Sequence, residues 1–172
     1  MTKAPRTPYP PDLDEGARPP TELGDLSDAI LSELDCAGHR FPRLELSRVE
    51  LRTCRLTGAE LGEARLTDTV FRDCQLDLAG FRNATLTRVQ FSDCRLEEAE
   101  LQHATLTDVL FERCSLRAAN ISSARCQRIE LRDCDLSALV GLDALRRARM
   151  TLGDVLANAP VFASALEIEI VE

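Results

Sequence analysis

The feature that most constrains the fold is an apolar residue at every fifth position from residue 46 to residue 136. Thirteen of these nineteen positions hold Leu and four hold Phe, with Ile121 and Cys126 completing the series. A small or β-branched residue lies two places before nearly every one of them. A period of five fits neither a helix nor a simple alternating strand. Two inward side chains separated by one outward residue instead indicate a short extended segment followed by a corner. Each five-residue unit would then form one side of a polygonal coil.

A second period of twenty residues predicts how many sides close one turn. Four columns recur at that spacing, one rich in β-branched residues, one of Cys and two of Ala. Their first members are Val49, Cys54, Ala59 and Ala64. Four distinct columns predict a square coil, stacked with like positions about 4.8 Å apart because the backbones of neighbouring coils must pair. The five Cys from Cys54 to Cys134 then form a ladder inside an all-β solenoid.

The repeat resembles that of the pentapeptide-repeat family. Ala119-Asn120-Ile121, Ala99-Glu100-Leu101 and Cys134-Asp135-Leu136 match its pattern of a small residue, Asp or Asn, and a central Leu. The likeness covers roughly residues 31–136 and implies a right-handed quadrilateral β-helix of about five to six coils. Asp or Asn rarely precedes the central residue here, which departs from the family pattern. The sequence of the C-terminal segment also resembles C-terminal sequences that are common among actinobacterial members of the family.

The flanks divide the chain into three predicted segments. Residues 1–25 hold six of the eight Pro and no apolar period, which predicts a mobile, disordered tail. Residues 26–140 are expected to form the β-helix, and residues 141–172 a C-terminal cap. The start of the coil has two readings. Residues 23–35 form either an irregular first coil from about Ala29, which we favour, or a short helical cap.

The C-terminal segment predicts a displaced last repeat and one or two short helices. The register fails at Gly141, and Ala148-Arg149-Met150 looks like a shifted repeat. Thr151 and Asp154 have the spacing of a capping box. Leu152, Val155 and Leu156 would then form an apolar face, with Pro160 breaking that helix or beginning a second. Residues 166–170 alternate in polarity and predict a terminal strand.

Composition and charge bear on the class of partner. The net charge is −8, and the excess acid lies in the flanks, so the near-neutral middle offers no basic stripe for direct nucleic-acid binding. No apolar run is long enough to cross a membrane, and the first twenty residues do not resemble a signal peptide. We therefore expect a cytoplasmic protein.

The sequence carries no recognisable catalytic or metal motif. Seven Cys include no CxxC pair, and the chain has only two His, His39 on an inward column and His103 at an outward position. The evenly spaced Cys are best explained as small apolar core residues. We expect no enzyme activity, cofactor or metal.

Two functions from different classes are compatible with these features of the sequence. The first is a non-catalytic protein-binding scaffold whose partner the sequence does not identify. The second, implied by the family resemblance, is a DNA mimic that binds DNA gyrase. Mimicry would need a continuous acidic face, and Arg55, Arg82, Arg95 and Arg117 interrupt the predicted one. The candidate partner-binding residues are Glu60, Glu63, Asp77, Glu97, Glu98 and Glu100.

The C-terminal segment contains more apolar residues than a simple tail needs. Gyrase-binding relatives join through their C-terminal ends, so the resemblance implies a homodimer formed cap to cap. The candidate interface residues are Leu152, Val155, Val161 and Phe162.

Overall fold

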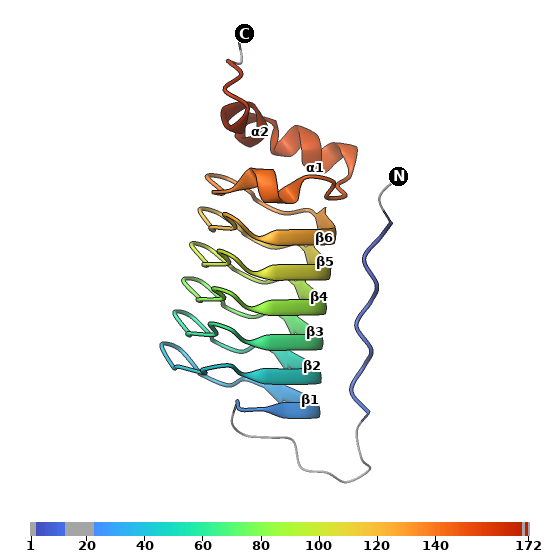
Figure 1. Cartoon of the computed structure of the whole chain (residues 1–172), viewed down its shortest axis with the longest axis vertical. Coiled ribbons are helices and arrows are strands. Elements are labelled where there is room, and N and C mark those ends of the chain that lie inside the picture. The colour runs from blue at the N-terminus through green and yellow to red at the C-terminus, as the bar shows by residue number, and fades with distance from the viewer. Residues whose placement is uncertain (1–2, 13–22, 170, 172) are drawn as a thin grey trace.

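The computed structural model describes residues 3–12, 23–169 and 171, and its main body is a β-solenoid (Figure 1). Six parallel strands stack in sequence order into one sheet. Partners in neighbouring strands lie twenty residues apart, as in the pair Leu46 and Leu66, which gives about five turns. The strands are β1 (Leu26–Ser32), β2 (Glu45–Arg52), β3 (Arg65–Arg72), β4 (Thr85–Ser92), β5 (Thr105–Glu112) and β6 (Arg125–Arg132).

Each turn combines one strand with two single-residue bridges, and a corner recurs every five residues. In the third coil, for example, Gln75 and Gly80 bridge to the coils on either side. Every fifth residue from 48 to 138 has a positive φ, including Thr53 at 53° and Gly58 at 65°. A left-handed residue bends the chain sharply while leaving the inward side chains on both sides pointing into the core. This explains the five-residue period in backbone terms.

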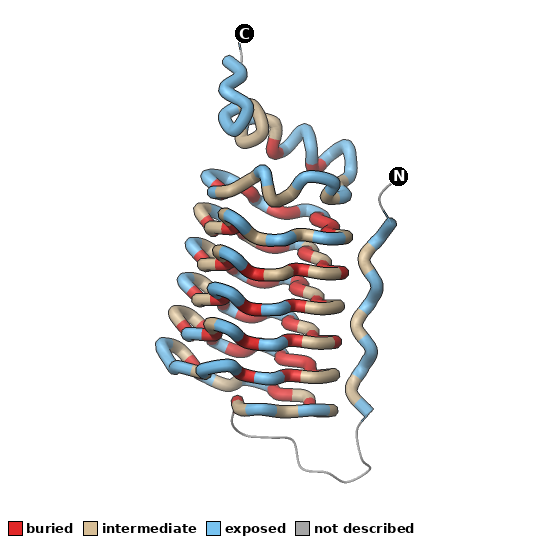
Figure 2. Tube along the Cα trace, viewed as in Figure 1, coloured by how far each residue is buried: buried red, intermediate tan, exposed pale blue. Residues whose placement is uncertain are grey.

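The predicted inward columns form the core (Figure 2). Leu96 and Leu101 are fully buried, and the Ala and Cys columns are buried with them except at the partly buried Ala124. Phe71, Phe91 and Phe111 stack through successive coils with ring centroids 4.9 and 5.0 Å apart. Identical side chains therefore pack on one another at the coil spacing, as the twenty-residue period predicted.

The first coil begins earlier than the favoured reading. β1 pairs with β2 from Leu26 onward, so this segment is a strand and the helical alternative is wrong. The coil above supplies a ready ladder of partners for its backbone. Pairing with that ladder outweighs the helical spacing of its leucines.

Residues 3–12 lie along the outside of the stacked strands, running from the β6 end toward β1 (Figure 1). A mobile tail was expected for residues 1–25, and the described part of it has this defined place. Residues 13–22 lie outside the described part of the chain.

The solenoid register breaks where the sequence predicted. Gly141 has φ 87°, and a Cβ there would lie 2.5 Å from the backbone nitrogen of Ser122. A 3₁₀ helix, η1 (Leu142–Leu145), follows it. Arg149 then bridges to Glu130, nineteen rather than twenty residues back. This is the predicted displaced repeat.

Two short helices, α1 (Leu152–Ala157) and α2 (Ala159–Ala165), close the chain, and Pro160 lies in the first turn of α2. Thr151 and Asp154 form the predicted capping box. The predicted terminal strand is wrong: residues 166 and 167 form a turn after α2, residues 168 and 169 have no regular structure, and Ile170 lies outside the described residues. No helix in the described part of the chain is long and apolar enough to cross a membrane.

α1 docks on the solenoid through its polar side. Leu152, Val155 and Leu156 are exposed, whereas Asp154 and Asn158 are buried. The last coil presents unpaired backbone groups, which need hydrogen-bonding partners more than they need an apolar cover. The predicted apolar face of α1 therefore points away from the coil.

Candidate functional site

The six acids of the predicted partner-binding cluster lie on the middle coils. Glu60 and Glu100 occupy one column, with Gly80 bridging between them. The N–H of Glu97 donates to the carboxylate of Asp77 one coil away, at 3.3 Å. Glu63 and Glu98 are exposed corner residues with positive φ.

Arginines on neighbouring coils pair with five of these six acids. The partners are Arg40 for Glu60, Arg43 for Glu63, Arg95 for Asp77, Arg117 for Glu97 and Arg82 for Glu100, with N to O separations of 2.5–3.6 Å. The guanidinium of Arg117 also lowers the pKa of Glu97 below its usual value. The cluster is thus a mixed-charge surface rather than a continuous acidic face.

A second charged column was not predicted from the sequence. It occupies left-handed corners and alternates acid and base from coil to coil: Asp28, Arg48, Asp68, Arg88, Asp108 and Arg128. We call it the Asp/Arg column. Arg88 and Arg128 each donate two N–H groups to the Asp of the coil before, at 2.5–2.7 Å, and Arg48 pairs with Asp28 in the same way. Like charges therefore recur every forty residues. Comparison of positions twenty residues apart does not reveal this pattern.

Two acidic side chains of this column are unusually buried for surface charges, whereas those of Asp28 and Arg48 are 23% and 41% exposed. The buried pair are Asp68 and Asp108, whose side chains are only 6% and 3% exposed. Burial raises the pKa of Asp68, but the Arg88 guanidinium and the Tyr9 N–H outweigh it, so the pKa stays below its usual value. Arg128 lowers the pKa of Asp108. Both carboxylates are therefore charged at neutral pH.

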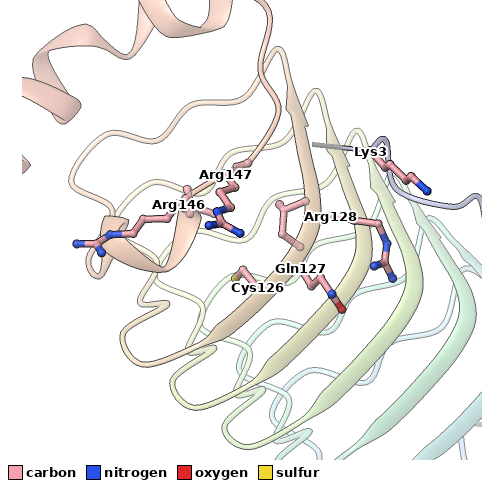
Figure 3. A pocket seen from close by; sticks show the side chains of 9 residues that line it. Lys3, Cys126, Gln127, Arg128, Arg146 and Arg147 are labelled. Carbon is pink, nitrogen blue, oxygen red and sulfur yellow. The ribbon is translucent and has the colours of Figure 1, made fainter. Parts of the chain in front are cut away.

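A pocket of about 500 Å³ lies where β6 meets the displaced repeat (Figure 3). Cys126 and Gln127 line it together with basic side chains from three parts of the chain: Lys3, Arg128, Arg146 and Arg147. In Figure 3 Lys3 and Arg146 extend in opposite directions, and Arg128 is already paired with Asp108. These cations do not converge on a point where one ligand could bind them all.

The pocket follows from the broken register. Cys126 occupies the column that holds Leu106 in the coil below, and the displaced repeat leaves it only partly covered. Burial still raises the pKa of its thiol to about 11. Cys126 is therefore a poor nucleophile at neutral pH, because little of it is thiolate.

The other thiols belong to the core. Of the seven Cys, all within the described residues, none forms a disulfide, and every one except Cys126 is buried. In the ladder, each Sγ lies 3.4–3.8 Å from a carbonyl oxygen of the coil before it. The predicted inward position of His39 is wrong, since it is exposed and its Nδ1 contacts the carbonyl of Ala37. The described residues contain no group of three or more His, Cys, Asp or Glu able to hold a metal ion.

The C-terminal residues predicted to form a dimer interface differ in exposure. Leu152 is 75% exposed and Val155 is 41% exposed. Val161 is half-buried, and Phe162 packs partly against the core cluster. Of these four residues, the two exposed ones lie on α1, and Leu166 and Ile168 after α2 are exposed as well.

Comparison with protein families agrees with this architecture. A family model described as "Pentapeptide repeat region" matches residues 44–121 and 79–140, more than half of the chain. The chain belongs to the pentapeptide repeat family. No curated protein sequence matches it.

Solved pentapeptide repeat structures resemble this one to different degrees. A pentapeptide repeat protein from the Arabidopsis thaliana thylakoid lumen aligns with a TM-score of 0.54 and 23% identity, covering 66% of this chain and 78% of its own. Rfr23 from the cyanobacterium Cyanothece 51142 gives 0.33 and 18%, covering 64% and 86%. QnrB1, a plasmid-mediated fluoroquinolone resistance protein, gives 0.37 and 16%, covering 88% and 92%. The first likeness supports the fold, and none of the three indicates a function.

Proposed function

We propose that this pentapeptide repeat protein is a non-catalytic scaffold that binds a partner protein through the flat outer faces of its solenoid. The observation that carries the proposal is the pairing of the predicted acidic cluster with arginines of neighbouring coils. Such pairing gives a rigid surface of interspersed charges. Charges of both signs at fixed spacing can complement a protein surface and exclude wrong partners.

The same pairing argues against the gyrase-directed DNA mimic. Duplex DNA presents one sign of charge at regular intervals, whereas Glu60, Glu97 and Glu100 each face an arginine. We expect micromolar protein neither to inhibit supercoiling by gyrase nor to protect the enzyme from a quinolone. Inhibition or protection at protein concentrations close to that of the enzyme would favour the mimic instead.

Affinity capture with the full chain tests the scaffold directly. The matched variant carries Glu60→Lys, Glu63→Lys and Glu100→Lys, exposed or half-exposed changes that leave the core intact. We expect a protein from the native host to bind the wild type saturably after purification and to lose at least tenfold in affinity for the variant. Equal affinity for both chains would contradict binding through this face.

We further propose that the scaffold is a homodimer joined through α1. Its docked side is polar, and its free side carries Leu152, Val155 and Leu156, of which Leu152 and Leu156 are 75% and 66% exposed. An exposed apolar patch of this kind is typical of an interface. A second copy of the same helix would cover it about a twofold axis.

Sedimentation of the full chain at tens of micromolar tests the dimer. We expect a dimer for the wild type and a monomer for Leu152→Glu with Leu156→Glu. These positions are better choices than Phe162, since a charge at Phe162 would also disturb packing on the core. A wild-type monomer would leave α1 as a cap alone.

A further inference from the structure

The N-terminal residues 3–12 dock on the Asp/Arg column through their backbone. The N–H of Arg6 donates to Asp108 Oδ1 at 3.1 Å, and the N–H of Tyr9 donates to Asp68 Oδ1 at 3.1 Å. The N–H of Asp12 completes the series, donating to Asp28 Oδ1 at 3.0 Å. Every third residue of the segment thus meets every second coil of the solenoid.

This match of spacings has a simple geometric origin. Three residues of a polyproline II helix advance about 9.3 Å, at about 3.1 Å each. Two coils of the solenoid advance about 9.6 Å, at about 4.8 Å each. A polyproline II segment laid along the column therefore stays in register with alternate coils. Because acid and base alternate in the column, those alternate coils are the ones that present a carboxylate.

The sequence of the segment fits this geometry. Pro5, Pro8 and Pro11 come immediately before the three donors Arg6, Tyr9 and Asp12. Proline fixes φ near the polyproline II value and has no N–H of its own. The prolines thus stiffen the segment at positions that donate nothing, and the donors follow at the positions that face carboxylates. Less conformational freedom is lost when such a segment docks.

Side chains add to the backbone contacts. The Tyr9 ring lies over the guanidinium of Arg88, which is 5.6 Å from the ring centroid. A cavity of about 110 Å³ lies between residues 4–8 and the sheet, with Val89 and Leu110 among its lining. The contact is otherwise shallow, and Tyr9 itself remains 64% exposed. An interface with few buried apolar groups can exchange one occupant for another.

We propose that the Asp/Arg column is a binding site for extended proline-rich polypeptide, and that residues 3–12 are its intramolecular occupant, which a proline-rich segment of a partner protein displaces. The ligand is defined by its chemistry: a polyproline II segment with a free N–H at every third residue and an aromatic ring placed to cover Arg88. Identification of the partner rests on the proposed scaffold function. Docking of the chain's own segment does not.

Amide hydrogen exchange of the full chain tests the intramolecular half alone. We expect the amides of Arg6, Tyr9 and Asp12 to exchange at least tenfold more slowly than that of exposed Thr7. Arg6→Pro should abolish the protection at Tyr9 and Asp12, because it removes one of three anchoring N–H groups. Arg6→Ala, which keeps the N–H, should preserve it. Exchange of all four amides at one rate would overturn the docking.

Peptide binding tests the site itself, with a fluorescent peptide of residues 3–12 as the probe. One full-length host carries Arg6→Pro with Asp12→Pro, and the matched host carries Arg6→Ala with Asp12→Ala. We expect the peptide to bind the proline host at least tenfold more tightly, because the alanine host keeps its own segment docked. A peptide with the same two prolines should not bind.

Equal binding to the two hosts would overturn the proposal, as would no binding to the proline host at millimolar peptide. Binding of the peptide that lacks the two N–H groups would overturn it as well. Because neither experiment uses a natural partner, failure of the scaffold function would leave these results unchanged.

Discussion

The side-chain amide of Asn158 stands in for a backbone peptide above Leu136. Its Oδ1 accepts from the N–H of Leu136 at 3.0 Å, and its Nδ2 donates to the carbonyl of Cys134 at 3.0 Å. One coil below, the backbone of Asp135 makes the same two bonds, to Leu116 and Cys114. The helix α1 thus ends the solenoid by continuing its hydrogen-bond ladder with a side chain.

Asn158→Ala is therefore expected to destabilise the protein by about 1–3 kcal/mol, because it leaves a buried N–H and a buried carbonyl without partners. Ala157→Ser, at an exposed position of α1 outside the proposed dimer interface, should change stability by no more than about 0.5 kcal/mol. Urea unfolding of the two variants measures the difference. Equal destabilisation by the two changes would mean that the hydrogen bonds of Asn158 do not hold α1 on the coil.

The five-residue register predicts opposite outcomes at adjacent positions. Leu96 is fully buried, so Leu96→Ala should cost roughly 2–5 kcal/mol. Glu97 is partly exposed and pairs with Arg117 at the surface, so Glu97→Ala should destabilise the protein far less, because a surface ion pair contributes little. Equal destabilisation in denaturant titrations would contradict the register.

The left-handed corners predict that two substitutions change the stability of the protein in opposite directions. Thr53 has φ 53° and is exposed, so Thr53→Gly should stabilise the fold by up to about 1 kcal/mol. Gly58 has φ 65°, and an added Cβ there would meet no atom within 4 Å. Gly58→Ala should therefore destabilise by about 1 kcal/mol for conformational reasons alone. Thermal unfolding of both variants checks the signs, and a stabilising Gly58→Ala would speak against a strained corner.

Thiol labelling should separate one Cys from the other six. Cys126 borders the pocket beside β6, whereas the ladder from Cys54 to Cys134 is buried. A bulky thiol reagent should modify Cys126 first and the others only after denaturation, with slow labelling at neutral pH because burial raises the Cys126 pKa to about 11. Mass spectrometry identifies the modified residue. Early labelling of Cys94 would contradict the core assignment.

Acid should release the N-terminal segment. Hydrogen bonds from the Arg48 side chain and the Asp12 N–H lower the pKa of Asp28 from 3.8 to about 2, and those of Asp68 and Asp108 are lowered too. A lowered folded pKa means that the stabilisation is complete above the unfolded value and is lost as pH falls through the folded value. We expect release between about pH 4 and pH 2.

Tyr9 reports this release, because the chain has one Tyr and no Trp. Its fluorescence anisotropy should fall over that interval, while far-ultraviolet circular dichroism of the solenoid changes little. Asp28→Asn with Asp68→Asn should show the low anisotropy already at pH 7. Anisotropy that stays constant down to pH 2 would contradict carboxylate anchoring.

The solenoid could be predicted from the sequence because its core contacts join equivalent positions of neighbouring coils. Each inward residue, such as Leu96, packs on its equivalents twenty residues before and after, so the pattern of one coil repeats in the next. The displaced repeat at Arg149 and the capping box at Thr151 could also be predicted, because each has a short, local sequence pattern.

Other contacts depend on the geometry of the stacked coils, and only the tertiary structure determined them. The face of α1 that docks was set by the unpaired backbone of the last coil, which selected Asp154 and Asn158 over the apolar stripe that the helix also carries. Likewise, prolines at positions 5, 8 and 11 suggest only a stiff tail until the rise of two coils is known. Once three residues of that tail match two coils, their N–H groups meet buried carboxylates, and the tail becomes part of the folded surface. Periodicity determines what repeats along the chain, whereas only the assembled stack determines which groups remain unpaired for other segments to satisfy.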